Sequence, residues 1–303
     1  MKSIIIFSIL LFVSIGLFAQ GESINNLSFT QRTDGSGMVD IYYDLSGSQN
    51  SYTISLEISF DGGATYQNTT TTSGDIRSCI APGNAKHIIL NAMADFPNAF
   101  SNNVKFRLTG SQFNCGTSTL PDAWGNDYTT VLIGNQCWMA ENLNSGVQIT
   151  SYMGSNHSAT GGHQSDNDII EKHCYDNDSA NCNSYGALYC WNEMMQYDTT
   201  EGIQGICPNG WHVPSDNEWK ILEGTVDSLY GIGDPEWDLG GVRGYNAHVN
   251  LKSTDSWSNA NNGVDLFGFT AKPGGCRNVI YAQFLHEGDH AHFWTSSQIS
   301  TMA

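Results

Sequence analysis

The feature that most constrains the fold is a regular alternation of apolar and polar residues in the first third of the chain. Apolar side chains occupy every second position in Val39–Leu45 and again in Tyr52–Phe60. Because successive side chains of a β-strand point to opposite faces, this period predicts strands that bury one face. Val104, Phe106 and Leu108 repeat the pattern and predict a final strand.

Turn-forming residues separate these predicted strands. Asp34–Gly37, Asp61–Gly63 and Ala81–Gly83 supply glycines, which tolerate positive φ, and a proline, which has a fixed φ. Several short strands with turns at such spacing in about 100 residues are typical of a β-sandwich. We therefore expect residues 22–110 to form a sandwich of immunoglobulin or fibronectin type III kind, and no catalytic grouping appears in it.

The N-terminus has the pattern of a secretory signal peptide. Lys2 precedes an apolar run, Ile4–Phe18, that is shorter than a membrane-spanning helix, and Ala19 offers a small residue at the cleavage position. We predict that residues 1–19 are a signal peptide, that no membrane span remains in the mature chain, and that the protein is secreted or reaches the cell surface.

The charge composition limits the partners. Lys and Arg together number 12 against 30 Asp and Glu, so the net charge is −18. A chain this acidic repels nucleic-acid backbones and anionic membrane surfaces, which excludes both as partners. Only 14% of the residues are charged, and a surface of neutral polar residues is typical of β-rich extracellular proteins.

Eight cysteines in an exported chain indicate disulfides, and the absence of a Cys-x-x-Cys pair argues against a zinc ribbon or a thioredoxin-like site. Cys174 and Cys182 close a short polar loop and form the simplest bridge to predict. Cys115 and Cys137 are further disulfide candidates, and spacing leaves the remaining connectivity open.

The second half differs from the first in its residue composition. Residues 111–122 are polar and predict a linker, and all eight tryptophans follow it. They indicate a fold held by aromatic anchors under long loops. Ser215 and Glu218 form the pattern of a capping box, so a helix should start there with Trp219, Leu222, Val226 and Leu229 on one face. The rest reads as short strands and loops, including residues 128–133 and 293–296, which makes residues 123–303 an α+β domain.

Motifs in this half resemble those of a known family. They are Ile-Gly-Asn-Gln-Cys-Trp-Met-Ala-Glu-Asn-Leu at 133–143, Tyr-Gly-Ala-Leu-Tyr at 185–189, Gly-Ile-Cys-Pro-Asn-Gly-Trp-His-Val-Pro-Ser-Asp at 205–216, Pro-Gly-Gly-Cys-Arg at 273–277 and Phe-Trp-Thr-Ser-Ser at 293–297. Between about Cys115 and Ser297 the chain resembles the Fibrobacter succinogenes major paralogous domain family. The preceding sandwich resembles the module often joined to this domain in secreted Bacteroidetes proteins.

The resemblance implies that the domain has a C-type-lectin-like fold. It also implies a domain that is exposed on the protein and serves binding more than catalysis. Family members typically continue well past the motif at 293–297 into further strands and a cysteine, so this domain looks truncated at its C-terminus. The lectin-like analogy would pair that cysteine with Cys207. We therefore expect a β-rich two-domain protein: an immunoglobulin- or fibronectin-III-like sandwich followed by an α+β C-type-lectin-like domain that lacks its C-terminal strands.

Two stretches contain metal-ligand residue types. His286-Glu287-Gly288-Asp289-His290, with His292 nearby, has the H-E-x-x-H spacing of zinc proteases, but that site needs a helix and Gly288 disfavours one. A polar loop is the favoured interpretation there, with adventitious metal binding as an alternative.

The second stretch lies in the loop between Cys174 and Cys182. Asp176, Asp178 and Asn181 supply oxygen atoms that suit calcium, although the EF-hand pattern is missing. An Asx-rich turn, whose side chains bond to their own backbone, is the favoured interpretation. No cofactor other than calcium is indicated.

Features of a catalytic site are few. The chain lacks a Gly-x-Ser-x-Gly motif, and the carboxylate pairs Glu193/Asp198 and Glu218/Glu223 require distances to be assessed. Tryptophan faces suit the apolar faces of sugars. Trp237 and Trp257, which lie in polar contexts, are the candidates for exposed ligand-binding residues.

These observations predict a secreted or cell-surface binding or adhesion protein without enzymatic activity, whose ligand is a glycan or a surface protein. Glycan recognition rests here on analogy between folds. A secreted metal-dependent hydrolase using the His286–His292 loop and a purely structural envelope component are the alternatives.

Overall fold

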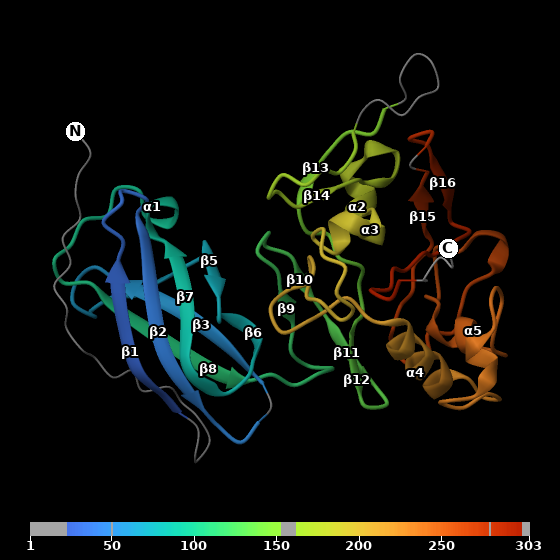
Figure 1. The fold of residues 1–303 in the computed structure, drawn as a ribbon, viewed down its shortest axis with the longest axis horizontal. Coiled ribbons are helices and arrows are strands. Elements are labelled where there is room, and N and C mark those ends of the chain that lie inside the picture. Colours follow the sequence, from blue (N-terminus) through green and yellow to red (C-terminus); the bar gives the residue numbers. More distant parts are fainter. Residues whose placement is uncertain (1–22, 50, 153–161, 279, 299–303) are drawn as a thin grey trace. The chain divides into compact units, whose positions relative to one another are not determined.

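The computed structural model describes residues 23–49, 51–152, 162–278 and 280–298 (Figure 1). The predicted signal peptide therefore lies outside the described residues. The chain divides into two compact units, Met1–Phe113 and Asn114–Ala303. It is β-rich, with several small sheets. No helix among the described residues has the length and apolarity needed to cross a membrane.

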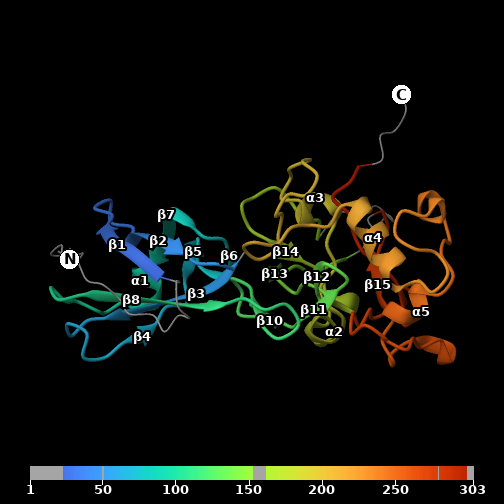
Figure 2. The same cartoon turned by 90° about the horizontal axis from the view of Figure 1, so that it is seen from below.

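Two antiparallel sheets build the first unit (Figures 1 and 2). One has the order β1-β2-β7-β5, from Ser23–Gln31, Met38–Ser46, Gly83–Asn91 and Thr72–Gly74. In the other, β3 (Tyr52–Ser59) pairs with β4 (Gln67–Asn68), β6 (Arg77–Ile80) and β8 (Lys105–Gln112). A short helix, α1 (Ala92–Asp95), follows β7.

The alternation along these strands produces one hydrophobic core between the sheets. Val39, Ile41, Tyr43 and Leu45 of β2 are at most 2% exposed. They belong to one cluster with alternate residues of the other strands: Tyr52, Ile54, Leu56, Ile58, Ile88, Leu90, Phe106 and Leu108. Burying each such side chain contributes about 1.5–3 kcal/mol to folding. The predicted one-faced strands of the first half are confirmed.

In the second unit, the sheets formed by the described residues have two strands each. The antiparallel pairs are β9 (Leu120–Pro121) with β10 (Asp127–Tyr128), β11 (Thr130–Ile133) with β12 (Gln136–Met139), and β15 (Gly274–Arg277) with β16 (Phe284–Glu287). The strands β13 (Val147–Gln148) and β14 (Glu171–Lys172) pair in parallel. The segment 111–122, predicted as a linker, holds the last residues of β8 and all of β9.

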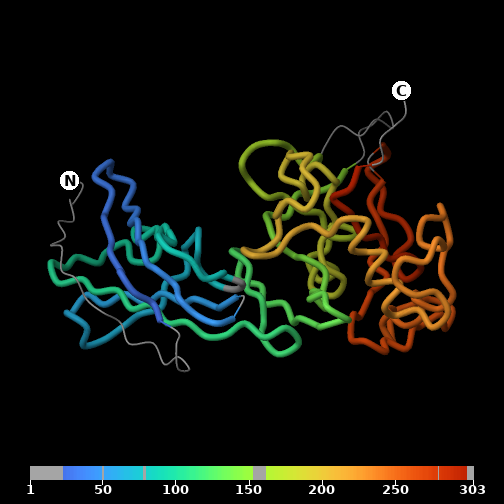
Figure 3. Tube along the Cα trace, turned by 60° about the horizontal axis from the view of Figure 1, so that its bottom comes forward, coloured from blue at the N-terminus to red at the C-terminus, as the bar shows by residue number. Residues whose placement is uncertain are grey.

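The helices of this unit are short (Figure 1), and the Cα trace runs through long loops between them (Figure 3). They are η1 (Tyr175–Asn177), α2 (Ser179–Tyr185), α3 (Trp191–Met194), α4 (Asp216–Val226), η2 (Pro235–Asp238), α5 (Ala247–Leu251) and η3 (Ser258–Ala260). One hydrophobic cluster packs α4 against α5 and β11 through residues such as Leu222, Leu251 and Ile133. A second contains Met194, Met195, Ile206 and Val213.

Helix α4 starts where the sequence predicts. Ser215 Oγ accepts from Glu218 N, and a Glu218 carboxylate oxygen accepts from Ser215 N at 2.8 Å, which completes the capping box. Leu222 and Val226 are buried and Trp219 is half-buried. The helix ends at Val226, so the prediction that Leu229 continues its buried face is wrong. Leu229 lies in the following turn and is 61% exposed.

Two carboxylates organise loops of the second unit that lack sheet partners. Asp227 accepts from the backbone N–H groups of Leu229, Tyr230, Tyr245, Asn246 and Ala247 at 2.8–3.1 Å. Asp122, 3% exposed, accepts from two backbone amides and from the side chains of Asn126, Tyr128 and Ser145. These acceptors satisfy loop amides that would otherwise be unpaired.

Candidate functional site

Segments that are far apart in the sequence meet at the start of α4. The last described segment, residues 291–298, is fixed there because Ser296 N donates to Pro214 O and Asp216 N donates to Ser297 Oγ, both at 2.8 Å. Gly202 N donates to Ser296 Oγ at 3.0 Å. These bonds occupy backbone groups that a strand would use, so residues 293–296 do not form the short strand that the sequence predicts.

Indole N–H groups fix the same segment from several directions. Trp191 Nε1 donates to Thr295 O at 2.9 Å, and Trp219 Nε1 donates to Trp294 O at 3.1 Å. Trp294 Nε1 donates to Tyr189 O at 2.8 Å. Each bond restricts the orientation of a ring, so these indoles are held in place by the protein backbone.

The rings at this junction form a cluster that is only partly covered. Trp219 lies 4.9 Å from Trp138 and 5.4 Å from Phe293 between ring centroids. Phe269, which is 6% exposed, contacts the rings of Trp219 and Phe293 at 6.1 and 5.9 Å. Phe293 and Trp294 are 39% and 47% exposed. Trp294 joins this group through its backbone, because its carbonyl accepts from Trp219 Nε1, while its own indole N–H is directed to Tyr189 O. We call Trp219, Phe293 and Trp294 the aromatic surface.

Charged pairs lie near this surface. Glu218 accepts from His212 Nε2 at 2.8 Å. Burial alone would raise the pKa of Glu218, but hydrogen bonds from Ser215 and His212 lower it below its usual value. Lys220 pairs with Asp216 at 2.9 Å on the next turn. The carboxylates are thus occupied by local partners.

The sequence did not single out this surface. Neighbouring side chains of an extended segment point in opposite directions, so two adjacent aromatic residues such as Phe293 and Trp294 cannot both enter one core. That adjacency was the available signal.

The structure corrects the choice of Trp237 as an exposed residue. Trp237 is 1% exposed, because its ring enters the core beside α4 and its Nε1 donates to Gly231 O at 2.9 Å. Trp257 is half-buried, and Lys252 Nζ lies 3.8 Å from its ring centroid. Its indole N–H donates to Ser253 and Ala271. Both residues are less exposed than Trp294, which is 47% exposed.

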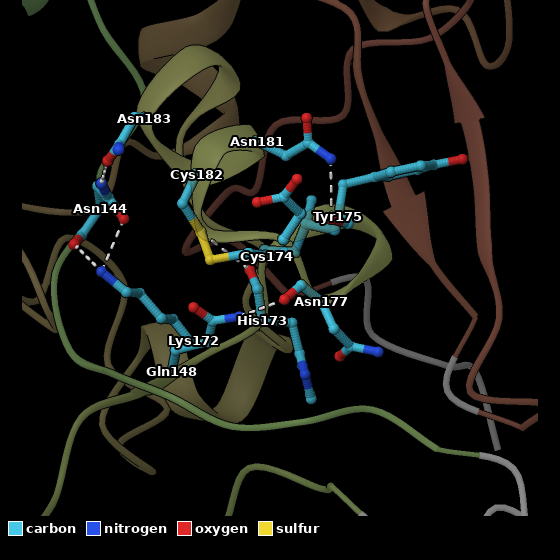
Figure 4. Close-up of a disulfide and its surroundings, with 12 residues drawn as sticks. Asn144, Gln148, Lys172, His173, Cys174, Tyr175, Asn177, Asn181, Cys182 and Asn183 are labelled. Carbon is cyan, nitrogen blue, oxygen red and sulfur yellow. Dashed lines mark hydrogen bonds between the residues drawn. A yellow bond between two sulfur atoms is a disulfide. The ribbon is translucent and has the colours of Figure 1, made fainter.

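The predicted calcium loop uses its polar side chains internally (Figure 4). Asp178 caps α2 by accepting from Ala180 N at 2.9 Å, and Asn181 Nδ2 donates to Tyr175 O at 3.0 Å. Asp176 is exposed. Two of the three predicted ligands therefore bond to nearby backbone, which is the arrangement of the Asx-turn alternative.

The His286–His292 loop is not helical. His286 and Glu287 end β16, and His286 has a φ of 67°. The His286 and His290 rings stack at 4.4 Å between centroids, and His290 lies 5.5 Å from His292. The helix that a zinc-protease site requires is missing here. Across the described residues, no group of three or more His, Cys, Asp and Glu side chains is placed to hold a metal ion.

The carboxylate pairs considered for glycoside hydrolysis have separate partners. Glu193 is fully buried and accepts from Glu171 N and Tyr197 Oη, while Asp198 accepts from Thr200. Glu223 accepts from Arg243 at 2.6 Å. Burial raises the pKa of Glu193.

Two disulfides form in the second unit. Cys174 pairs with Cys182, as predicted, and Cys115 pairs with Cys137. Cys190, Cys207 and Cys276 are free thiols. Burial raises the pKa of the Cys207 thiol to about 12, so this group is not a reactive thiolate.

The fold and the site define a β-rich, disulfide-containing chain whose second unit presents aromatic rings held by backbone hydrogen bonds. Residues 131–303 match the family described as the Fibrobacter succinogenes major domain, and the chain belongs to this family. Three motifs that carry the resemblance, at 185–189, 205–216 and 293–297, meet at the aromatic surface. No curated protein and no solved structure matches the chain at a significant level.

Proposed function

We propose that the protein is exported through its N-terminal signal peptide and acts outside the cell as a non-enzymatic binding protein. The first unit is an immunoglobulin- or fibronectin-III-like spacer, and the second is a C-type-lectin-like domain whose aromatic surface binds carbohydrate. Membership of the family and two disulfides are compatible with this assignment.

The partly exposed rings of the aromatic surface carry this proposal. A pyranose has an apolar C–H face that packs against an aromatic ring, and Phe293 and Trp294 leave 39% and 47% of their surface to solvent. The indole bonds of Trp219 and Trp294 fix the rings in advance, which reduces the conformational entropy lost on binding.

The charge of the chain favours neutral glycans over acidic ones. A net charge of −18 repels polyanions such as uronic-acid polymers at low ionic strength. Retention on an array of neutral and acidic polysaccharides tests the proposal. We expect retention on neutral polysaccharides, and no retention on any polysaccharide would contradict carbohydrate binding and leave the structural envelope role.

A pair of variants links retention to the aromatic surface. Trp294→Ala removes an exposed ring, and we expect it to weaken binding about tenfold, or about 1.4 kcal/mol. Trp124→Ala is the matched control, because Trp124 is 45% exposed in the same unit but lies outside the surface. Since Trp294→Ala also removes the bond to Tyr189 O, circular dichroism should first show that both variants are folded. Equal losses in both variants would contradict the assignment.

A further inference from the structure

Lys172 and Asn144 lie in direct contact beside the Cys174–Cys182 disulfide (Figure 4). Lys172, the last residue of β14, brings Nζ to 2.7 Å from Asn144 Oδ1 and to 2.5 Å from Asn144 O. Both side chains are half-buried. The amine and the carboxamide carbon of Asn144 are therefore neighbours within van der Waals reach.

Asn144 is held in position on every side. Its N–H donates to Tyr128 Oη at 2.9 Å, and its Nδ2 donates to Asn183 Oδ1 at 3.4 Å. Asn126 Nδ2 donates both to Asn144 O and to the buried carboxylate of Asp122. Tyr128 Oη also donates to Asp122, so Asp122 positions Asn144 through two intermediates.

The amine has no salt-bridge partner in the part of the chain that the structure describes. Burial lowers the pKa of Lys172, and the charge of Asp122 opposes that shift only in part. A lowered pKa increases the fraction of neutral amine, which is the nucleophilic form.

We propose that Lys172 and Asn144 form an intramolecular isopeptide bond. Nζ of Lys172 attacks Cγ of Asn144, so an Nζ–Cγ bond forms and the Cγ–Nδ2 bond breaks. Nδ2 leaves as ammonia and takes up the protons released by the lysine ammonium, so the products are one secondary amide and one ammonium ion. No oxidant, reductant or other co-reactant is needed. The fixed contact supplies the high effective concentration that such a slow amide exchange requires.

The bond would act alongside the disulfide. It joins positions 28 residues apart and, like a disulfide, restricts the unfolded chain. Unlike a disulfide, it survives reducing conditions. It would thus keep the loop before β13 attached to β14 when Cys174–Cys182 is reduced.

The mass of the purified, reduced mature protein tests the proposal. We expect a mass lower than that of the sequence by one ammonia, and a peptide map with one branched peptide that contains both Asn144 and Lys172. Trypsin does not cleave after an acylated lysine, so cleavage at Lys172 should be lost. Separate linear peptides for the two residues, with normal cleavage at Lys172, would overturn the proposal.

Two variants complete the test. Lys172→Arg keeps the positive charge and hydrogen-bond donors but lacks the amine, so we expect it to retain the ammonia. An N-terminal glutamine exposed by signal cleavage also loses ammonia on cyclisation, and the branched peptide distinguishes the two losses. Asp122→Asn should lower the cross-linked fraction at a given time after synthesis, whereas a purely structural role would change the melting temperature and leave that fraction unchanged.

Discussion

The first unit is held together by two β-sheets, whereas the loops of the second unit are held mainly by single side chains that bond to several backbone groups. In the first unit, β2 and β3 place alternate side chains in one continuous core. In the second, two smaller clusters lie between loops, and the described sheets have two strands each. The comparison shows that a chain can order long loops when single side chains satisfy many backbone groups at once.

Asp227 illustrates this difference. In the first unit, the backbone N–H groups of β2 find partners in β1 and β7. In the second, a single carboxylate accepts from amides at 229–230 and 245–247. Asp227 thus joins the two ends of the loop 228–246. It directly follows α4, the helix that carries Trp219 of the aromatic surface.

The largest expected effect comes from removing one core residue in each unit. Trp237→Ala and Leu108→Ala each empty a fully buried site, and we expect a cost of about 3–5 and 2–5 kcal/mol in the unit that carries the change. Calorimetry combined with limited proteolysis would show which unit is lost. If either change destabilised both units equally, the two cores would not be independent.

Reduction of the disulfides should have the next largest effect, and it should destabilise the second unit only. Cys115–Cys137 and Cys174–Cys182 both lie in the second unit and span 22 and 8 residues. Loop-closure entropy predicts a loss of about 3.4 kcal/mol for Cys115–Cys137 and about 2.5 kcal/mol for Cys174–Cys182. Urea unfolding with and without reductant measures it. The strands of the first unit should keep their hydrogen-exchange protection after reduction. Loss of that protection together with unfolding of the second unit would show that the disulfides also stabilise the first unit.

Asp227→Ala is expected to cost about 3 kcal/mol, since several loop amides lose a charged acceptor. Asp238→Ala is a suitable control, because Asp238 is an exposed carboxylate of the same unit with one cation partner, Lys220. Thermal unfolding compares the two. Equal and small effects would show that the loop 228–246 is held by other contacts.

Acid should weaken both units over the same pH range, for different reasons. Hydrogen bonding to Arg32 lowers the pKa of Asp40 to about 2. Burial opposes the shift at Asp227, but backbone amides bring its pKa to about 2 as well. A carboxylate with a lowered folded pKa stabilises above its unfolded value near 4, and this contribution disappears as the pH falls toward about 2. Melting temperatures from pH 6 to pH 2 should show this loss, and Asp227→Ala should flatten the profile of the second unit only.

The smallest expected effect is that of the capping box. Ser215→Ala removes the acceptor for Glu218 N and should cost about 1 kcal/mol. Ser215→Asp keeps an acceptor and should restore most of it. The midpoints of urea unfolding measure both changes. If Ser215→Ala left the midpoint unchanged, the contacts of Ser296 and Ser297 would be sufficient to hold the start of α4.

The two units also differ in how much of them the sequence predicts. Alternation is a local signal, so β2, β3 and β8 follow directly from residue order. The capping box is equally local, and α4 begins as predicted. Trp237 was predicted to be exposed because its neighbours in the sequence are polar. Tyr230 and α4 bury it, and these contacts form only when the loop folds, so the local sequence does not indicate them. The junction of residues 189–191, 214–219 and 293–297 depends on contacts between distant segments, which periodicity does not encode.

Hydrogen exchange of the whole chain, measured with and without a neutral polysaccharide that retains it, tests the central claim most directly. If the aromatic surface binds the sugar, amides at 214–219 and 293–297 should gain protection, while β2, β3 and β8 should not change. Protection confined to the first unit, or to segments away from these residues, would contradict the account.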